Sequence, residues 1–102
     1  YDHTQAVIIR DNKVISRETR KGTKEMIKSI PKSKIKKGIL IKLPKVKQDL
    51  RVDLPTIGID TFKDCNKAGI KGIVIKANQN ILLNKELSIK YANKNKLFLL
   101  AI

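Results

Sequence analysis

The sequence of 102 residues contains few residues of the types that build disulfides, zinc sites and aromatic platforms. It has one cysteine, one histidine, no tryptophan, two tyrosines and two phenylalanines. A single cysteine, Cys65, excludes an internal disulfide, and we expect it to be a small buried hydrophobe on a helix face. One histidine, His3, beside one cysteine argues against the usual zinc site. So few aromatic residues also argue against a stacking platform for single-stranded nucleic acid.

Acidic residues are scarce too. Nine Asp and Glu oppose 23 Lys and Arg, which gives a formal net charge of +14. A positive net charge favours anionic lipid surfaces or phosphates as partners. Because 19 of the 23 bases are Lys, spread along the whole chain with no Arg-rich helix, no specific nucleic acid is expected.

Long apolar runs are absent as well. No stretch approaches the roughly 20 residues that a helix needs to cross a bilayer, and no signal-peptide pattern is present. The chain begins at Tyr1 without Met, and its first stretch already resembles a strand. We therefore expect a piece of a longer protein, with an N-terminal part missing.

The apolar pattern, with 41% hydrophobic residues, predicts a single α/β domain with a mixed sheet of about five to six strands and three helices. The expected strands are 5–10, 14–18, 38–43, 71–77, 81–83 and 97–102, and the expected helices are 24–30, 61–68 and 85–93. Strands 5–10 and 14–18 should form a hairpin, as should 71–77 and 81–83. Strands 38–43 and 71–77 should be parallel with a right-handed crossover.

The predicted helix ends follow from capping residues. Thr23, Asp60 and Asn84 are the expected N-caps. Pro31 should close the first helix, and Gly69 is the expected C-terminal glycine of the second. The apolar faces should carry Met26, Ile27 and Ile30 in the first helix, Phe62, Cys65 and Ala68 in the second, and Leu87 and Tyr91 in the third.

The stretch from Gln48 to Asp60 concentrates acids in a basic chain. It holds three of the nine acids and one of the four arginines. Pro55 should extend the backbone, and Gly58 should free it just before a helix. The loop is expected at the carboxyl end of strand 38–43, where open α/β sheets bind ligands. Such a loop suits a metal-bridged phosphate, and the alternative is a plain connecting loop with a capping Asp.

Two lysine features leave alternatives open. Lys42, near the end of strand 38–43, either faces a ligand crevice or snorkels to solvent. The basic connector 32–37, with Lys32, Lys34, Lys36 and Lys37, is either a patch for lipid or nuclear localisation or a solvated loop.

The segment Gln48-Asp-Leu-Arg-Val-Asp-Leu-Pro-Thr-Ile-Gly58 resembles the signature loop of the UDP-2,3-diacylglucosamine pyrophosphatases of lipid A biosynthesis, LpxI type. The resemblance extends in order over essentially the whole chain, through segments 21–27, 38–42, 68–73 and 97–98. It is to the C-terminal domain of that family, which a separate N-terminal domain precedes.

The resemblance implies a Gram-negative enzyme that hydrolyses the pyrophosphate of UDP-2,3-diacylglucosamine. Water would attack the α-phosphorus and release UMP and 2,3-diacylglucosamine 1-phosphate (lipid X), with Mg²⁺ or another divalent cation. It implies work at the cytoplasmic face of the inner membrane as a peripheral protein, together with the N-terminal domain. A homodimer is also expected.

Asp53 matches the acid that is essential for catalysis in the family. Side-chain chemistry adds the other roles: Asp49 as a second metal ligand beside Asp53, and Arg51 for a bidentate phosphate contact. The expected substrate-binding residues are Gln48, Thr56, Gly58, Lys42, Gly22 and Thr23.

The chain departs from the family before and after Gly22-Thr23, where Lys21 and Lys24 replace acids. Glu18 matches a family acid. Glu25 stands one residue away from the lost acid at Lys24, and because a helix turns by about 100° per residue it should point elsewhere.

Two further functions remain open from the sequence. The chain is either a non-catalytic basic module that binds anionic lipid or nucleic acid, or a structural, dimerising domain with the chemistry elsewhere. Binding of unrelated polyanions with steep salt dependence would favour the first alternative.

Overall fold

The computed structural model describes residues 4–19, 21–44, 56–76 and 81–102. Its elements, in chain order, are β1 (Thr4–Arg10), β2 (Lys13–Arg17), α1 (Thr23–Ser29), β3 (Ile39–Pro44), β4 (Thr56–Ile57), α2 (Ile59–Ala68), β5 (Gly72–Ile75), β6 (Ile81–Leu82), α3 (Lys85–Lys94) and β7 (Phe98–Ala101). The predicted α/β class with three helices is confirmed.

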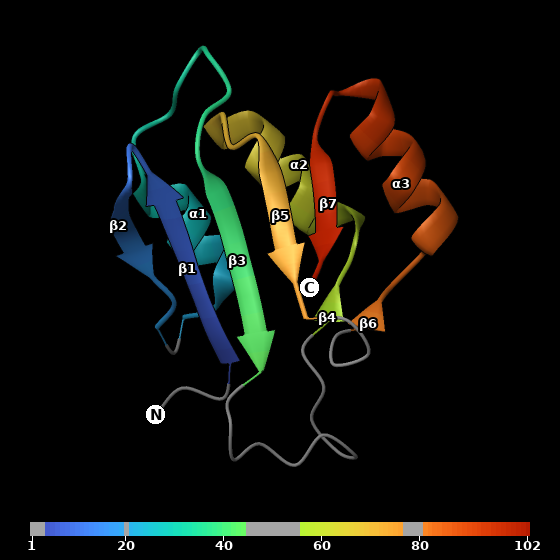
Figure 1. The fold of residues 1–102 in the computed structure, drawn as a ribbon, viewed down its shortest axis with the longest axis horizontal. Helices are drawn as coiled ribbons and strands as arrows, with labels where there is room; N and C mark the ends of the chain where they lie inside the picture. Colours follow the sequence, from blue (N-terminus) through green and yellow to red (C-terminus); the bar gives the residue numbers. More distant parts are fainter. Residues whose placement is uncertain (1–3, 20, 45–55, 77–80) are drawn as a thin grey trace.

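Five strands form one mixed sheet in the order β2-β1-β3-β5-β7 (Figure 1). β1 is antiparallel to β2 and β3, while β5 is parallel to both β3 and β7. The predicted hairpin of the first two strands and the parallel pair β3–β5 are therefore confirmed. The helices α1 and α2 lie behind the sheet in this view, so its front face is open.

The second predicted hairpin is wrong. β6 does not pair with β5 but runs parallel to β4, with Thr56 opposite Ile81 and Ile57 opposite Leu82. The physical reason is that β5 has β3 on one side and β7 on the other, so neither of its edges is free. The short pair β4–β6 also places Ile57 in the core, where it is 1% exposed.

Two of the predicted caps are wrong. The N-cap of α1 is Gly22, and Thr23 is the first helical residue. Likewise Gly58 is the N-cap of α2, and Asp60 lies exposed in the first turn. Asn84 is the N-cap of α3, as predicted, but its side chain makes no cap hydrogen bond. In both wrong cases the backbone turns one or two residues earlier, at a glycine.

Gly69 is the C-cap of α2, as predicted, with a left-handed φ of 84°. A Cβ atom there would also collide with the carbonyl of Ser33. Only glycine therefore meets both the conformation and the space.

The core is aliphatic and lies between the helices and the back of the sheet. Its fully buried side chains include Ile8, Leu40, Ile57, Phe62, Cys65, Ile70 and Ile73. Met26, Ile27 and Ile30 of the first helix segment are buried too, as predicted. Burial raises the pKa of the Cys65 thiol to about 12, which makes it an inert hydrophobe.

The apolar face predicted for α3 is only partly right. Tyr91 packs against the core, but Leu87 is 53% exposed. The buried residues of α3 are Ser88 and Ala92. The Ser88 hydroxyl donates to the Leu83 carbonyl at 3.1 Å, so a polar side chain occupies the place that the pattern assigned to leucine.

Arg10 ties β1 to the basic connector. Its guanidinium is buried and donates to the carbonyls of Pro31, Lys37 and Ala68 at 2.7, 3.2 and 3.2 Å. The connector is also bound to the end of α2, because the Ser33 amide donates to the Ala68 carbonyl. Lys32, Lys34 and Lys37 of the connector are exposed, as the alternative of a solvated loop predicts, while these hydrogen bonds hold its backbone to β1 and α2.

Candidate functional site

The described site residues come from three segments that meet at the carboxyl end of β3. Lys42 lies near the end of this strand, Thr56 lies in β4, and Thr23 begins α1. In Figure 1 the arrow of β3 points to the lower edge of the sheet, where the short strand β4 also lies. Parallel strands bring functional loops to such an edge.

Lys42 is buried, with only 8% of its surface exposed. Its Nζ donates to the Thr56 carbonyl at 3.0 Å, so β3 holds the backbone where β4 begins. Of the two alternatives for this side chain, snorkelling to solvent is wrong. Loss of solvation lowers the pKa of Lys42, and the Glu18 carboxylate partly opposes this shift.

Glu18 connects Lys42 to the start of α1. The Thr23 hydroxyl donates to the Glu18 carboxylate. The Glu18 amide donates to the Ala6 carbonyl at 2.8 Å, and Ala6 lies opposite Lys42 in the register of β1 and β3. The structure thus brings Thr23, Glu18, Lys42 and Thr56 into one polar cluster. Glu18 is the member that residue chemistry missed; the one signal for it was its match to a family acid.

The two glycines of the site differ in what they require. Gly22 has a φ of 93°, and no atom lies within 4 Å of where its Cβ would stand. A side chain there would be strained although the space is open. Gly58 has an extended backbone, and a Cβ would make ordinary contact with Leu83. The expectation that Gly58 frees the backbone is therefore wrong.

The lysines that replace family acids are exposed. Lys21 and Lys24 both lie on the surface. Glu25 approaches Lys28 at 3.9 Å on the exposed side of α1, so it points away from the Thr23–Glu18 pair, as predicted. Lys24 instead lines a hollow of about 300 Å³ between α1 and α2, with Lys28, Lys32, Lys67 and Asp64 as the other charged side chains. That hollow carries four cations and one anion.

Four predicted site residues lie outside the described residues: Gln48, Asp49, Arg51 and Asp53. Within residues 4–19, 21–44, 56–76 and 81–102, no group of three or more His, Cys, Asp and Glu side chains is arranged to hold a metal ion. The described cluster supplies one carboxylate, that of Glu18.

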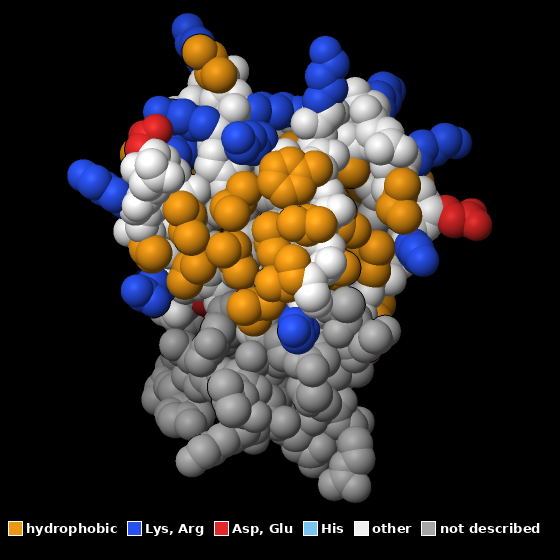
Figure 2. All heavy atoms as spheres, viewed as in Figure 1, with side chains coloured by type: hydrophobic (Ala, Val, Ile, Leu, Met, Phe, Trp, Pro, Cys, Tyr) orange, Lys and Arg blue, Asp and Glu red, His pale blue; other side chains and the backbone are white. Residues whose placement is uncertain are grey.

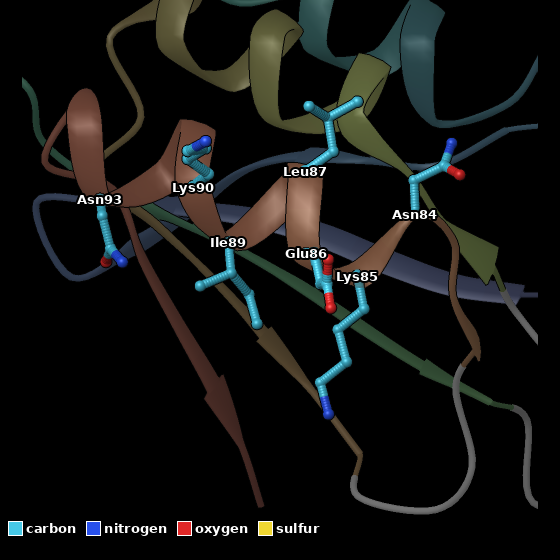
Figure 3. A pocket seen from close by; sticks show the side chains of 7 residues that line it. All are labelled: Asn84, Lys85, Glu86, Leu87, Ile89, Lys90 and Asn93. Atoms are coloured by element: carbon cyan, nitrogen blue, oxygen red, sulfur yellow. The ribbon is translucent and has the colours of Figure 1, made fainter.

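A larger hollow, of about 1000 Å³, lies elsewhere. Its described lining comes from α3 and its N-cap: Asn84, Lys85, Glu86, Leu87, Ile89, Lys90 and Asn93 (Figure 3). None of these residues belongs to the cluster around Lys42. Size alone therefore does not make this hollow the candidate site.

The lowered pKa of Lys42 predicts a dependence of stability on pH. Between that lowered value and the unfolded value of about 10.4, the unfolded chain binds a proton that the folded chain does not, so stability rises with pH. The free energy of unfolding of the wild type, minus that of Lys42→Met, should therefore increase as pH is raised toward 10. Urea melts at a series of pH values measure this difference.

Lys63→Met, at an exposed position of α2, is the matched control. Parallel curves for wild type and Lys42→Met would contradict the prediction.

The described chain offers no helix that is both long and apolar enough to cross a membrane.

Comparison with known proteins gives two matches. The family described as LpxI C-terminal domain matches residues 1–100. The chain is also 31% identical over 109 residues to the UDP-2,3-diacylglucosamine pyrophosphatase LpxI of Caulobacter vibrioides, covering 99% of this chain and 39% of that protein. The chain thus spans about two fifths of the length of the curated relative.

Proposed function

Because the chain belongs to the LpxI C-terminal domain family, we propose that it forms part of an enzyme that hydrolyses the pyrophosphate of UDP-2,3-diacylglucosamine. The products are UMP and 2,3-diacylglucosamine 1-phosphate. The observation that carries the proposal is the family match over residues 1–100, which includes the acidic loop from Gln48 to Gly58. Since the chain spans 39% of its relative, we assign the activity to a protein in which an N-terminal domain completes the site.

In this proposal water attacks the α-phosphorus. Asp53 orients the water and Arg51 binds phosphoryl oxygens through two parallel hydrogen bonds. Lys42 acts on the backbone: its Nζ donates to the carbonyl of Thr56, which follows Asp53 by three positions in the sequence. Gln48, Thr56, Gly58, Gly22 and Thr23 are the proposed substrate-binding residues. Positioning of this kind supplies much of the acceleration in phosphoryl transfer.

A divalent cation, Mg²⁺ by its preference for carboxylate oxygens, would be held by Asp53 and Asp49 and would neutralise charge on the phosphoryl oxygens. The polar cluster limits where such an ion fits. The Lys42 ammonium already stands beside Glu18, and two cations do not share one carboxylate without repulsion. We therefore place the ion on the aspartates and not on Glu18.

The acylated substrate suggests peripheral contact with the cytoplasmic face of the inner membrane. Two of the four connector lysines support this, because Lys32 and Lys34 are exposed. The other two are engaged within the domain: Lys36 donates to the Asn95 carbonyl, and Lys37 pairs with Asp11 at 3.3 Å. We accordingly assign the lipid contact to Lys32 and Lys34.

A second candidate function is a basic module that binds phosphates without hydrolysing them. The hollow between α1 and α2, with its four lysines and one aspartate, favours this alternative. Such a module should bind UDP-2,3-diacylglucosamine no more tightly than other polyanions, and its affinity should fall steeply as salt rises.

Isotope labelling tests the proposed reaction. The protein with both domains is incubated with UDP-2,3-diacylglucosamine in ¹⁸O-water, and the products are weighed by mass spectrometry. Attack at the α-phosphorus puts one ¹⁸O into UMP and none into the diacylglucosamine 1-phosphate. Label in the sugar phosphate would place the attack at the other phosphorus. Absence of hydrolysis, together with salt-sensitive binding of unrelated polyanions, would replace the enzyme with the binding module.

A further inference from the structure

The hollow between α1 and α2 differs in charge from the larger hollow beside α3. Its described lining has four lysines and one aspartate, whereas that of the α3 hollow has two lysines and one glutamate. It lies on the helix side of the sheet, opposite the open face, where Figure 2 shows hydrophobic side chains with lysines and arginines around them. Its volume of about 300 Å³ is at the lower end of the range for small-ligand pockets. The hollow is therefore compact and cationic, and it lies away from the apolar face.

The lysines of this hollow lack close carboxylate partners. Within the part of the chain that the structure describes, Lys24, Lys32 and Lys67 form no ion pair. Lys28 has one, but its Nζ lies 3.9 Å from the Glu25 carboxylate, on the exposed side of α1. Lys24 and Lys28 also stand one helical turn apart, where like charges repel. An anion in the hollow would relieve this repulsion.

The walls of the hollow strengthen its attraction for an anion. Two buried apolar residues, Ile27 and Ala68, contribute to the lining and are 2 and 3% exposed. Charges of one sign that surround a cleft with low-dielectric walls focus their field into it. We therefore expect an anion to be held more strongly here than on an open lysine-rich surface.

The carboxyl end of α2 borders the hollow, and free carbonyls at a helix end repel anions. The Ala68 carbonyl is not free: it accepts from the Ser33 amide at 3.1 Å and from the Arg10 guanidinium at 3.2 Å. Arg10 is buried, so its charge adds to that of the lysines from inside the domain. The helix end therefore does not oppose an anion at this place.

The backbone that carries the lysines is held in place. Three of the four stand on helices, and the fourth, Lys32, stands on the connector. On one side of Lys32 the Pro31 carbonyl accepts from Arg10 at 2.7 Å, and on the other the Ser33 amide donates to the end of α2. A site whose backbone is fixed before binding loses less conformational entropy when the ligand binds.

We propose that this hollow binds a phosphate group that carries two or more negative charges, as in a phosphomonoester or a diphosphate. Such groups carry about two charges at pH 7, and lysine ammonium groups bind phosphate as point charges. The same chemistry occurs in free phosphorylated compounds and in the headgroups of phosphorylated lipids. Because Lys24 replaces an acid of the family, the site is a feature of this chain's own sequence.

The site shares no residue with the Lys42 cluster or with the loop from Gln48 to Gly58. It therefore goes beyond the proposed hydrolysis and does not rest on it. The tests below need no substrate, so their failure would leave the hydrolytic function untouched.

Titration of the 102-residue chain with inorganic pyrophosphate, followed by amide NMR, tests the position of the site. In buffer freed of divalent cations, metal-bridged binding to the aspartates plays no part. The largest shifts should fall on amides of α1, the last turn of α2 and Lys32, and the affinity should fall as salt rises. Absence of saturable binding would overturn the proposal, and so would shifts that are largest around Lys42 or on α3.

Lys24→Glu should weaken pyrophosphate binding about tenfold or more, a factor typical of losing one hydrogen bond between charged groups. Lys24 lies in the first turn of α1, where an acid suits the helix dipole, so the variant should fold. Lys90→Glu is the matched control, because it reverses the same charge at an exposed lysine of α3. Equal weakening by the two variants would reduce the effect to net charge and overturn the site.

Vesicle sedimentation identifies the source of the phosphate. Vesicles of phosphatidylcholine with an equal share of phosphatidic acid present phosphomonoesters, and vesicles with phosphatidylglycerol instead present phosphodiesters. If the chain prefers the former, and pyrophosphate and Lys24→Glu both reduce that binding, the hollow binds a lipid headgroup. If pyrophosphate binds at the hollow and the chain shows no such preference, the ligand is a free phosphorylated compound. If neither pyrophosphate nor phosphatidic acid binds in a way that Lys24→Glu weakens, the proposal is wrong.

Discussion

Replacing Asp53 by asparagine in the protein with both domains is expected to lower the rate of UMP release by about 10³-fold, within the range for loss of a positioned acid–base group. Asparagine keeps the size of the side chain and removes the charge that would hold the cation and orient the water. Substrate affinity should change little, because Asp53 is proposed to act in the transition state and not in binding. Product release at saturating substrate and equilibrium binding of substrate to the variant measure the two quantities separately.

Asp60→Asn is the matched control for this experiment. Asp60 belongs to the same acidic stretch, but it lies exposed in the first turn of α2, whose N-cap is Gly58. Its loss should cost only a few tenths of a kcal/mol through the helix dipole and leave the rate unchanged. Equal loss of activity in both variants would point to general charge effects, and full activity of Asp53→Asn would remove Asp53 from the proposed mechanism.

The large elements of the fold could be predicted because their sequence signals are local. Continuous apolar residues in 38–43 and 71–77 indicate buried strands, and the three-residue spacing of Phe62, Cys65 and Ala68 indicates a helix face; all are found. Gly69 after that face marked the helix end correctly. In each case the residues of a single segment are enough to predict the structure of that segment.

The pair β4–β6 could not be predicted because its cause is not local. Thr56–Ile57 is two residues long and carries no periodicity. It becomes a strand because Ile57 is drawn into the core and because Ile81–Leu82 finds both edges of β5 occupied. Similarly, Thr23 and Asp60 have the chemistry of caps, but the backbone turns at Gly22 and Gly58.

The site, too, has parts that local sequence signals predict and parts that they do not. Gln48 to Gly58 stood out through its acids, and family resemblance singled out Asp53. Neither signal shows that Lys42 is buried against Thr56, or that Glu18 lies between Lys42 and Thr23. These contacts link Thr23 with Glu18, Glu18 with Lys42, and Lys42 with Thr56. The two residues of a pair are up to 24 positions apart in the sequence. Only the strand order β2-β1-β3 brings them together.

Arg10→Met is expected to lower the free energy of unfolding by about 3 kcal/mol, since it removes three hydrogen bonds from a buried charge and leaves the Pro31 and Lys37 carbonyls without the guanidinium as donor, while the Ala68 carbonyl keeps the Ser33 amide. Arg10 is 6% exposed and bonds Pro31, Lys37 and Ala68. Methionine fills similar space, so the loss reports the hydrogen bonds more than a cavity. For a domain of this size the melting temperature should fall by roughly 15 °C.

Arg17→Met separates this effect from the mere loss of a positive charge. Arg17 is an exposed residue of the edge strand β2, and its replacement should stay within about 0.5 kcal/mol of the wild type. If Arg10 pins the connector to β1 and α2, Arg10→Met should also speed amide exchange of Ser33 and Lys37, whose N–H groups donate to Ala68 and Gly69. Unchanged exchange at these amides, or equal melting of the two variants, would show that the connector is held without Arg10.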